Sequence, residues 1–364
     1  MTTAEIYKKG IKITEIDTPS IVVDLNIAEE NIKKMQNFAN DNNVSMRPHS
    51  KTNKSPYWAK KQIQAGAIGI CCAKLGEAEM MAAGGVNEIL IPNQIVTPEK
   101  INRLVEVNKI SKVMVAVENK KNIDDLSYEF EKNSMKLSVI IEVNVGMDRC
   151  GVELDEIVDF AQFIIDKPGL KFEGIMGYEG HTVNIGNFED RVNETTKAMD
   201  KLINAKSILE DNGIDVKIVS ASGTGTYNIT SKIPGITELQ CGSYIFMDGN
   251  YLKIFNDFQP ALSVLCTVVS RRENRIVIDC GLKSISMDQG LPEVVYPKGV
   301  KLISLSEEHC KCEIEGDVDL KIGDKVFVRP MHSDTTINLH ENYFVHRDGI
   351  FDEKVEIVGR GKFK

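Results

Sequence analysis

Short apolar runs alternate with segments of helical periodicity over the first two-thirds of the chain. Between the first two runs, Ala28, Ile32, Met35 and Ala39 recur at steps of three and four, the spacing of one helix face. Uninterrupted apolar runs are typical of parallel strands that are buried on both faces. We predict eight such strands: Ile21 to Leu25, Val44 to His49, Ala67 to Ala73, Glu88 to Pro92, Lys112 to Val117, Leu137 to Val145, Phe172 to Gly180 and Val216 to Ser222.

Eight strand and helix units predict an α/β fold of the (β/α)8 TIM type, although a doubly wound open sheet gives the same local pattern. From about Phe255 the sequence changes to strands and turns without helical periods. We therefore predict two domains. The β/α barrel spans 18–254, and a mostly antiparallel β domain spans 255–364 together with the N-terminal segment 1–17.

Composition and charge narrow the class of protein. The first seventeen residues contain no apolar core of signal-peptide length, and no later stretch reaches the roughly 18 apolar residues that span a bilayer. We therefore expect a cytoplasmic protein that does not bind membranes. The net charge of -9 is spread without a basic stripe, which argues against nucleic acid and for a small-molecule substrate.

The eight cysteines show no repeated CxxC spacing and are expected to be reduced thiols. Cys310 and Cys312 flank a single residue. A metal pair is conceivable there, but a solvated hairpin is the favoured interpretation.

Lys51 is the first candidate for chemistry, because reactive groups of a parallel barrel lie at the carboxyl ends of its strands. It follows the run that ends in RPHS, which we count as the second strand. A lysine there can reach the barrel mouth and form an imine with an aldehyde cofactor. The alternative is a solvated lysine like its neighbour Lys54.

Two loops of small residues follow the last predicted strand. They are Ser220-Ala-Ser-Gly-Thr-Gly-Thr226 and Cys241-Gly-Ser-Tyr244. Such loops offer backbone N–H groups and hydroxyls to a phosphate, which barrels of this type bind at their late strands. Together with Lys51 they fit a phosphorylated aldehyde such as pyridoxal phosphate.

Three further polar residues follow the sixth and seventh predicted strands. Arg149 could hold a carboxylate or a cofactor oxygen, Tyr178 could pack on a ring, and His181 could move a proton near neutral pH. Each residue alone is at least as compatible with a structural role as with a functional one. Their convergence at successive strand ends favours a functional one.

In the predicted β domain, His332 and Asp334 are two residues apart and would share one face of an extended segment. An imidazole beside a carboxylate suits a divalent ion that keeps open positions for water or substrate. The HxD pattern by itself is common and usually carries no function.

Eight segments in this order resemble the D-threonine aldolase and D-serine dehydratase family, from about residue 17 to 339. They are DTPSIVVDL, MRPHSKTNKS, GICCAKLGEAE, NVGMDRCGV, GYEGH, SASGTGT, ELQCGSY and MHSDTTINL. The resemblance implies an alanine racemase-like barrel with a β domain, pyridoxal phosphate and a homodimer.

The resemblance also implies a role for individual residues. Lys51 would carry the cofactor, with Arg149 and Tyr178 at its ring or hydroxyl. Its phosphate would lie near Ser222, Gly223, Thr224, Gly242 and Ser243. His332 and Asp334 would bind the catalytic ion, and His181 would be the candidate base.

One position helps to choose the reaction. Family members that dehydrate D-serine or D-threo-3-hydroxyaspartate typically have Cys at the second metal position, whereas this chain has Asp334. Carboxylate ligation favours a hard ion such as manganese, with magnesium, cobalt or zinc as alternatives. We therefore predict a D-threonine aldolase that cleaves D-3-hydroxyamino acids to glycine and an aldehyde. Dehydration to a 2-oxo acid and ammonia stays the alternative, ahead of a metal-free racemase or a non-catalytic cofactor carrier.

Overall fold

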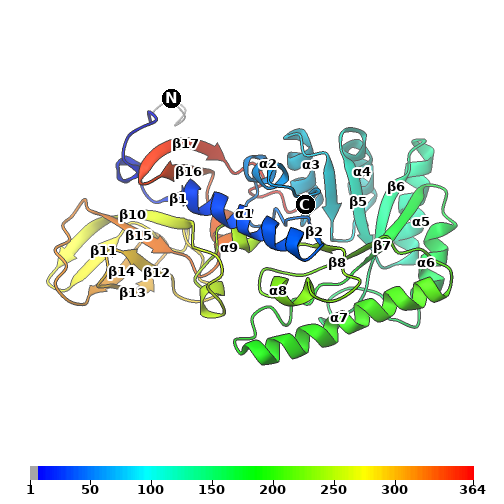
Figure 1. Ribbon diagram of the computed structural model, residues 1–364. Helices are drawn as coiled ribbons and strands as arrows, with labels where there is room; N and C mark the ends of the chain where they lie inside the picture. Colours follow the sequence, from blue (N-terminus) through cyan, green and yellow to red (C-terminus); the bar gives the residue numbers. More distant parts are fainter. Residues whose placement is uncertain (1–6) are drawn as a thin grey trace. The chain divides into compact units, whose positions relative to one another are not determined.

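The computed structural model describes residues 7–364 (Figure 1), so residues 1–6 of the predicted N-terminal segment 1–17 lie outside the described part. The chain forms two compact units. The barrel unit comprises 34–51, 56–242 and 362–364, and the β unit comprises the residues up to Lys33, 52–55 and 243–361.

The barrel unit contains a sheet of eight parallel strands in the order β2-β9-β8-β7-β6-β5-β4-β3. A parallel bridge between His49 and Cys71 joins the two ends of this order, so the sheet closes on itself. The predicted α/β barrel class is thereby confirmed. The strands are β2 (Ser45–Met46), β3 (Ile70–Cys71), β4 (Glu88–Ile91), β5 (Lys112–Val117), β6 (Leu137–Glu142), β7 (Leu170–Met176), β8 (Ile218–Ala221) and β9 (Glu238–Leu239).

Helices follow the barrel strands and lie outside them (Figure 1). They are α2 (Pro56–Gln64), α3 (Leu75–Ala83), α4 (Pro98–Ile110), α5 (Lys120–Lys132), α6 (Ile157–Ile165), α7 (Phe188–Asp211) and the short α8 (Tyr227–Thr230). Helix α1 (Leu25–Asp41) crosses the division between the units at Lys33. Apolar side chains such as Met114, Ile140 and Met176 form a buried cluster from neighbouring strands. This packed core holds the strand ends in fixed positions.

The predicted strand Ile21 to Leu25 does not belong to the barrel. It forms β1 (Ser20–Asp24), which lies between two other strands of the β unit and is buried along its centre. A central strand of this kind reads as an uninterrupted apolar run, just as a barrel strand does. The eighth barrel strand is instead β9, whose two residues are too few to show a pattern. Lys51 therefore follows the first barrel strand, and the Ser220–Thr226 loop follows the seventh.

The β unit contains a mostly antiparallel nine-stranded sheet, as predicted, with the order β13-β14-β11-β10-β1-β16-β17; β15 pairs with β10 and β12. These strands are β10 (Leu262–Arg272), β11 (Arg275–Ile278), β12 (Glu293–Tyr296), β13 (Val300–Leu305), β14 (Cys310–Ile314), β15 (Lys325–Arg329), β16 (Asn342–Arg347) and β17 (Ile350–Glu356). The unit also contains α9 (Ser333–Ile337) and the short 3-10 turns η2 (Ile13–Glu15), η3 (Ser243–Ile245) and η4 (Tyr251–Lys253).

Cys310 and Cys312 lie on β14, which pairs with strands on both sides. β14 forms a hairpin with β13, as expected, but both cysteines are fully buried, so the expectation that the hairpin is solvated there was wrong. The alternation that placed them two residues apart puts both on the inner face of the strand.

Among residues 7–364, no helix combines the length and the apolar character that crossing a bilayer requires.

Candidate functional site

Lys51 lies directly after the first barrel strand, where the chain turns at the carboxyl edge of the sheet. Its backbone N–H donates to Nδ1 of His49 at 3.4 Å, which restrains the start of the turn. The side chain is half-buried, and its Nζ lies 5.8 Å from the ring centroid of Tyr178. Tyr178 follows the sixth barrel strand, so the barrel brings together residues that are far apart in sequence.

Arg149 approaches the same tyrosine ring, with its Cζ 5.7 Å from the ring centroid. Its side chain is half-exposed, so the guanidinium stays accessible. Lys51, Arg149 and Tyr178 thus form one group at the carboxyl edge of the barrel. The group combines an amine, a cation and an aromatic ring face.

The small-residue loop Ser222–Thr226 lies against Tyr178. A Cβ added to Gly223 would lie 3.2 Å from a carbon of the Tyr178 ring, and one added to Gly225 would lie 2.2 Å from the carbonyl oxygen of Val183. The two glycines therefore allow the loop backbone to pack closely, at Gly223 against the tyrosine ring and at Gly225 against the segment that contains Val183.

The chain after β9 runs beside this loop. Cys241 Sγ donates to the carbonyl oxygen of Gly223 at 3.3 Å, and Gln240 N–H donates to the carbonyl oxygen of Ala221 at 2.9 Å. Gly242 follows and is buried. Ser243, also buried, begins η3 and belongs to the β unit.

The donor set of the barrel unit fits pyridoxal phosphate. Lys51 supplies an amine for the aldehyde, Tyr178 supplies a face for the ring, and the loop Ser222–Thr226 places small residues at the seventh barrel strand, where barrels of this type bind phosphate. Each of these groups was predicted from its position after an apolar run.

Glu179 is a buried carboxylate that the sequence analysis did not single out. It accepts hydrogen bonds from three donors in and just after the loop Ser222–Thr226: Thr226 Oγ1 at 2.7 Å, Thr230 Oγ1 at 2.6 Å and Ser222 N–H at 3.1 Å. Its only sequence signal is its place in the segment GYEGH, between Tyr178 and His181.

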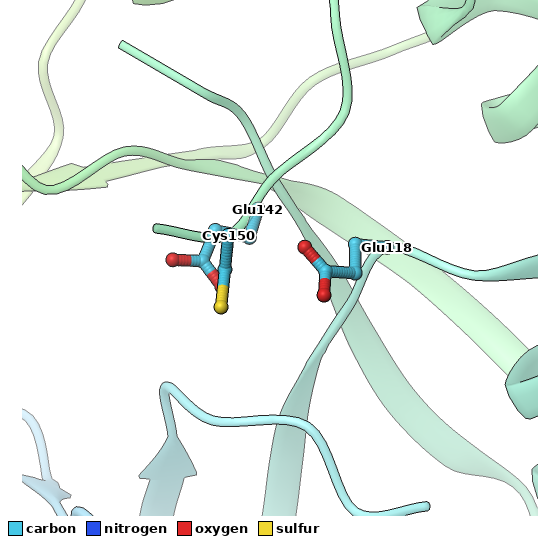
Figure 2. Close-up of side chains that lie close together, drawn as sticks. All are labelled: Glu118, Glu142 and Cys150. Carbon is cyan, nitrogen blue, oxygen red and sulfur yellow. The ribbon is translucent and has the colours of Figure 1, made fainter. Parts of the chain in front are cut away.

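A cluster of two carboxylates and a thiol lies near Arg149. Glu118, Glu142 and Cys150 lie close together (Figure 2), with one ligand-type atom of each within 4.8 Å of the others. Gln94 donates to Glu142 at 2.5 Å, and the Gly151 N–H donates to Glu118. These donors account for the two carboxylates without an ion.

Glu142 also lies 4.0 Å from the guanidinium of Arg149. Burial raises the pKa of Glu142, while the hydrogen bond from Gln94 and the charge of Arg149 oppose that rise. Burial likewise raises the pKa of the Cys150 thiol, with the charges of Glu142 and Glu118 acting in the same direction. Arg149 thus lies beside a carboxylate that is buried at the end of β6.

His181 is exposed and lies beside the loop that follows β6. Its Nε2 is 3.6 Å from the position that a Cβ would take on Gly146, and Lys201 Nζ is at the same distance. An exposed imidazole at this edge is able to exchange protons with a bound molecule or with water.

In the β unit, His332 precedes α9 and Asp334 lies in its first turn. The expectation of one extended segment was wrong here: His332 itself is extended, but the chain then turns into α9, where the Thr336 hydroxyl donates to the carbonyl oxygen of His332 at 2.9 Å. His332 Nδ1 lies 2.5 Å from an oxygen of Asp288. With Nδ1 held in this way, the lone pair of Nε2 is directed away from Asp288.

The surroundings of Asp334 and His332 are acidic. Burial and, to a smaller extent, the charge of Asp334 raise the pKa of Asp248 to about 6, although hydrogen bonds from backbone N–H groups oppose the rise. Burial lowers the pKa of His332, but the carboxylates of Asp334, Asp288 and Asp248 outweigh it, so the pKa is raised overall. Asp248 in turn accepts from the Ser333 N–H at 3.2 Å, at the start of α9.

These residues fit a divalent metal ion. Asp334 Oδ1 is buried and has no hydrogen-bond partner, whereas buried carboxylate oxygens normally have one. A cation bound there together with His332 Nε2 would satisfy this oxygen. The sequence analysis missed Asp288, which lies 44 residues from His332, and Asp248, which lies 85 residues from Ser333.

Known protein families match both the barrel unit and the β unit. The family model described as "Alanine racemase, N-terminal domain" matches residues 23–249, and the model described as "Putative serine dehydratase domain" matches residues 261–346. The chain is 36% identical to 3-hydroxy-D-aspartate aldolase of Paracoccus denitrificans (strain Pd 1222), covering 97% of this chain and 94% of that protein. It is 34% identical to D-threonine aldolase of Arthrobacter sp, covering 97% and 95%.

Solved structures extend the likeness to the fold. The crystal structure of D-threonine aldolase from Filomicrobium marinum superposes with a TM-score of 0.95 at 31% identity, covering 98% of this chain and 99% of that one. D-threo-3-hydroxyaspartate dehydratase from Delftia sp. HT23 gives a TM-score of 0.87 at 24% identity, covering 95% and 98%.

Proposed function

The chain belongs to the D-threonine aldolase and D-serine dehydratase family, with a barrel domain of the alanine racemase type, and we propose that it is a D-threonine aldolase. It would cleave D-3-hydroxyamino acids to glycine and an aldehyde, using pyridoxal phosphate and a divalent metal ion. From D-threonine the products would be glycine and acetaldehyde.

Asp334 is the observation that carries the choice of reaction. It places a carboxylate with a buried, unpartnered oxygen beside His332, and that donor pair favours a hard ion such as manganese, with magnesium, cobalt or zinc as alternatives. The curated aldolases at 36% and 34% identity support the same choice, whereas the curated D-threo-3-hydroxyaspartate dehydratase of Delftia sp. (strain HT23) is 26% identical over 76% of this chain.

The barrel residues would hold the cofactor and the substrate. When bound, pyridoxal phosphate supplies a ring that accepts electrons from a bond broken at the substrate's Cα. Lys51 would bind its aldehyde, Tyr178 would pack on its ring, and Arg149 would hold its hydroxyl or a carboxylate. The phosphate would lie against Ser222, Gly223, Thr224, Gly242 and Ser243.

The remaining groups would handle the substrate's β-hydroxyl. His332 and Asp334 would hold the ion, whose chemistry there is that of a Lewis acid. His181 would remove the hydroxyl proton as the Cα–Cβ bond breaks and would hold that proton on its imidazole. Asp288 would keep the His332 ring in one orientation through Nδ1.

Product analysis separates cleavage from dehydration. The purified protein, stripped of metal and resupplied with pyridoxal phosphate and manganese, is incubated with D-threonine, D-serine and D-3-hydroxyaspartate. We expect glycine and an aldehyde from D-threonine, with loss of both products on adding a chelator. A 2-oxo acid and ammonia as the main products would replace the aldolase by the dehydratase.

We also propose that the protein acts as a homodimer in the cytoplasm, as its resemblance to the family implies. Sedimentation equilibrium of the purified chain tests the first part, since a dimer has twice the 40.6 kDa mass of the chain. A single species of monomer mass at micromolar concentration would contradict it.

A further inference from the structure

We infer that Glu179 is a positioning residue that fixes the loop Ser222–Thr226 in its phosphate-binding conformation. The inference rests on the proposed function, because it assumes that pyridoxal phosphate binds at Lys51. It adds a residue to which neither the family resemblance nor the predicted site assigned a role.

Glu179 lies three residues after the end of β7, and it is fully buried. Both of its carboxylate oxygens are used. Oε1 accepts from the hydroxyls of Thr226 at 2.7 Å and Thr230 at 2.6 Å, and Oε2 accepts from the Ser222 N–H at 3.1 Å. All three donors lie after β8, so one carboxylate binds the neighbouring strand's loop at both of its ends.

The bond to Ser222 acts where the backbone is strained. Ser222 has a φ of 82°, in the left-handed region that residues other than glycine and asparagine rarely adopt. Such a conformation persists only where its surroundings hold it in place. The Glu179 Oε2 contact is a bond to the N–H of this same residue.

The bond to Thr226 sets the direction of a second hydrogen bond. Because the Thr226 hydroxyl donates to Glu179, its oxygen is free to accept from the Gly223 N–H, which lies 3.2 Å away. A carboxylate can only accept, so this order of donors is fixed as long as Glu179 is ionised. A glutamine could present its NH₂ group to the hydroxyl and reverse the order.

Glu179 also connects the loop to the segment that carries the Tyr178 ring. Its neighbour Tyr178 lies against Gly223, where an added Cβ would be 3.2 Å from the ring. A shift of the loop would therefore change the backbone offered to the phosphate more than it would change Lys51, which lies after a different strand. Loss of Glu179 should weaken binding of the phosphate in particular.

The test compares two aldehydes that differ only in the phosphate. Apo protein and its Glu179→Gln variant are titrated with pyridoxal phosphate and with pyridoxal, following the absorbance of the lysine imine. We expect the dissociation constant for pyridoxal phosphate to rise about tenfold or more, as for loss of a hydrogen bond to a charged group. The constant for pyridoxal should stay within about twofold.

Glu173→Gln is the matched control. Glu173 lies on β7, six residues before Glu179; it accepts from Ser138 Oγ at 2.9 Å and pairs with Lys171 at 2.5 Å, both outside the loop. It should leave both dissociation constants unchanged. Equal weakening of both aldehydes in Glu179→Gln, or no change in either, would overturn the inference. A wild-type protein that forms no imine with pyridoxal phosphate would instead overturn the proposed function, and the inference with it.

Thr230 provides a second variant, should Glu179→Gln fail to fold. It lies outside the loop, and its hydroxyl donates to Glu179 at 2.6 Å. Thr230→Val should weaken pyridoxal phosphate selectively, by about three- to tenfold, whereas Thr230→Ser keeps the hydroxyl and should restore wild-type affinity. Equal affinities of the valine and serine variants for pyridoxal phosphate would contradict the positioning role.

Discussion

Asp334 carries a carboxylate oxygen that is buried without a hydrogen-bond partner. Leaving a buried acceptor unsatisfied lowers stability by about 1–3 kcal/mol, and more for a charged group. The same oxygen lies in the first turn of α9, next to the histidine whose Nδ1 is held by Asp288. A bound cation would give this oxygen a partner and so remove the loss of stability.

Asp334→Ala should therefore separate stability from metal binding. In the presence of a chelator, we expect the variant to unfold at the same temperature as the wild type or slightly above it, because an unsatisfied carboxylate has been removed. Manganese should raise the unfolding temperature of the wild type by binding the folded state, and this increase should be lost in the variant. Thermal denaturation with and without manganese measures both effects.

Asp319→Ala is a suitable control, because Asp319 is largely exposed and forms a surface ion pair with Lys321 at 3.6 Å. It should keep the manganese-dependent increase. An Asp334→Ala variant that manganese stabilises as much as the wild type would remove Asp334 from the metal site.

His340 gives the β unit a predictable dependence on pH. Burial lowers its pKa below the ordinary value of 6.5, and its ring donates from Nε2 to the carbonyl oxygen of Ser284 at 2.7 Å. The unfolded chain takes up a proton near pH 6.5 while the folded chain does not, so stability falls as the pH drops below that value. The slope from one such group is at most about 1.4 kcal/mol per pH unit.

His340→Gln should flatten this part of the acid-side slope. Urea unfolding at pH 7.5, about 6 and about 5 gives the free energy of unfolding at each pH. The exposed His309→Gln serves as the control and should keep the wild-type slope. If His340→Gln shows the full wild-type decrease between these pH values, another group is responsible for it.

At the scale of residues, the sequence predicted the polar side chains that follow an apolar run. It did not predict the carboxylates that hydrogen-bond to the neighbouring loop and to His332. Lys51, Arg149 and Tyr178 could be found because the end of a parallel strand is visible in the pattern. Glu179 and Asp288 bind partners 43 to 51 and 44 to 47 residues away, respectively. No local pattern predicts contacts at that separation.

At the scale of elements, the close packing of loops depends on positions without side chains. Gly225 faces the carbonyl oxygen of Val183, and a Cβ there would be only 2.2 Å from it. Backbone on both sides leaves little room for adjustment. The loop after β8 and the segment after β7 therefore fix each other's place.

Gly225→Ala should lower the free energy of unfolding by about 1–3 kcal/mol, the usual effect of overpacking. Gly186→Ala is its matched control, because an added Cβ there meets nothing within 4 Å. The control should stay within about 0.5 kcal/mol of the wild type. Urea unfolding measures both variants, and equal stability of the two would show that the loop can move aside.

The strands also show what the hydrophobic periodicity of the sequence cannot predict. Burial on both faces gives β1 and the barrel strands the same apolar signature, so β1 was assigned to the wrong sheet. Pairing partners decide the sheet, and they are not encoded in the period. The two-residue β9 is fixed by its parallel pairing with β8 and β2 rather than by a pattern of its own.

At the scale of the whole molecule, the sequence predicted an α/β barrel with a β domain from the change of pattern near Phe255. The contacts divide the chain more finely, because residues 52–55 belong to the β unit while Lys51 belongs to the barrel unit. Tyr343 Oη donates to the carbonyl oxygen of Asn53 at 2.6 Å, which anchors that segment. A single domain boundary near Phe255, predicted from the change of pattern, cannot assign residues 52–55 to the β unit.

The central claim is that this barrel carries pyridoxal phosphate on the lysine that follows its first strand. The most direct test is to load the protein with pyridoxal phosphate, reduce it with borohydride, digest it and map the labelled peptide by mass spectrometry. We predict one pyridoxyl group per chain, attached to Lys51. A label on another lysine, such as Lys54 or Lys201, or no label at all, would contradict the account.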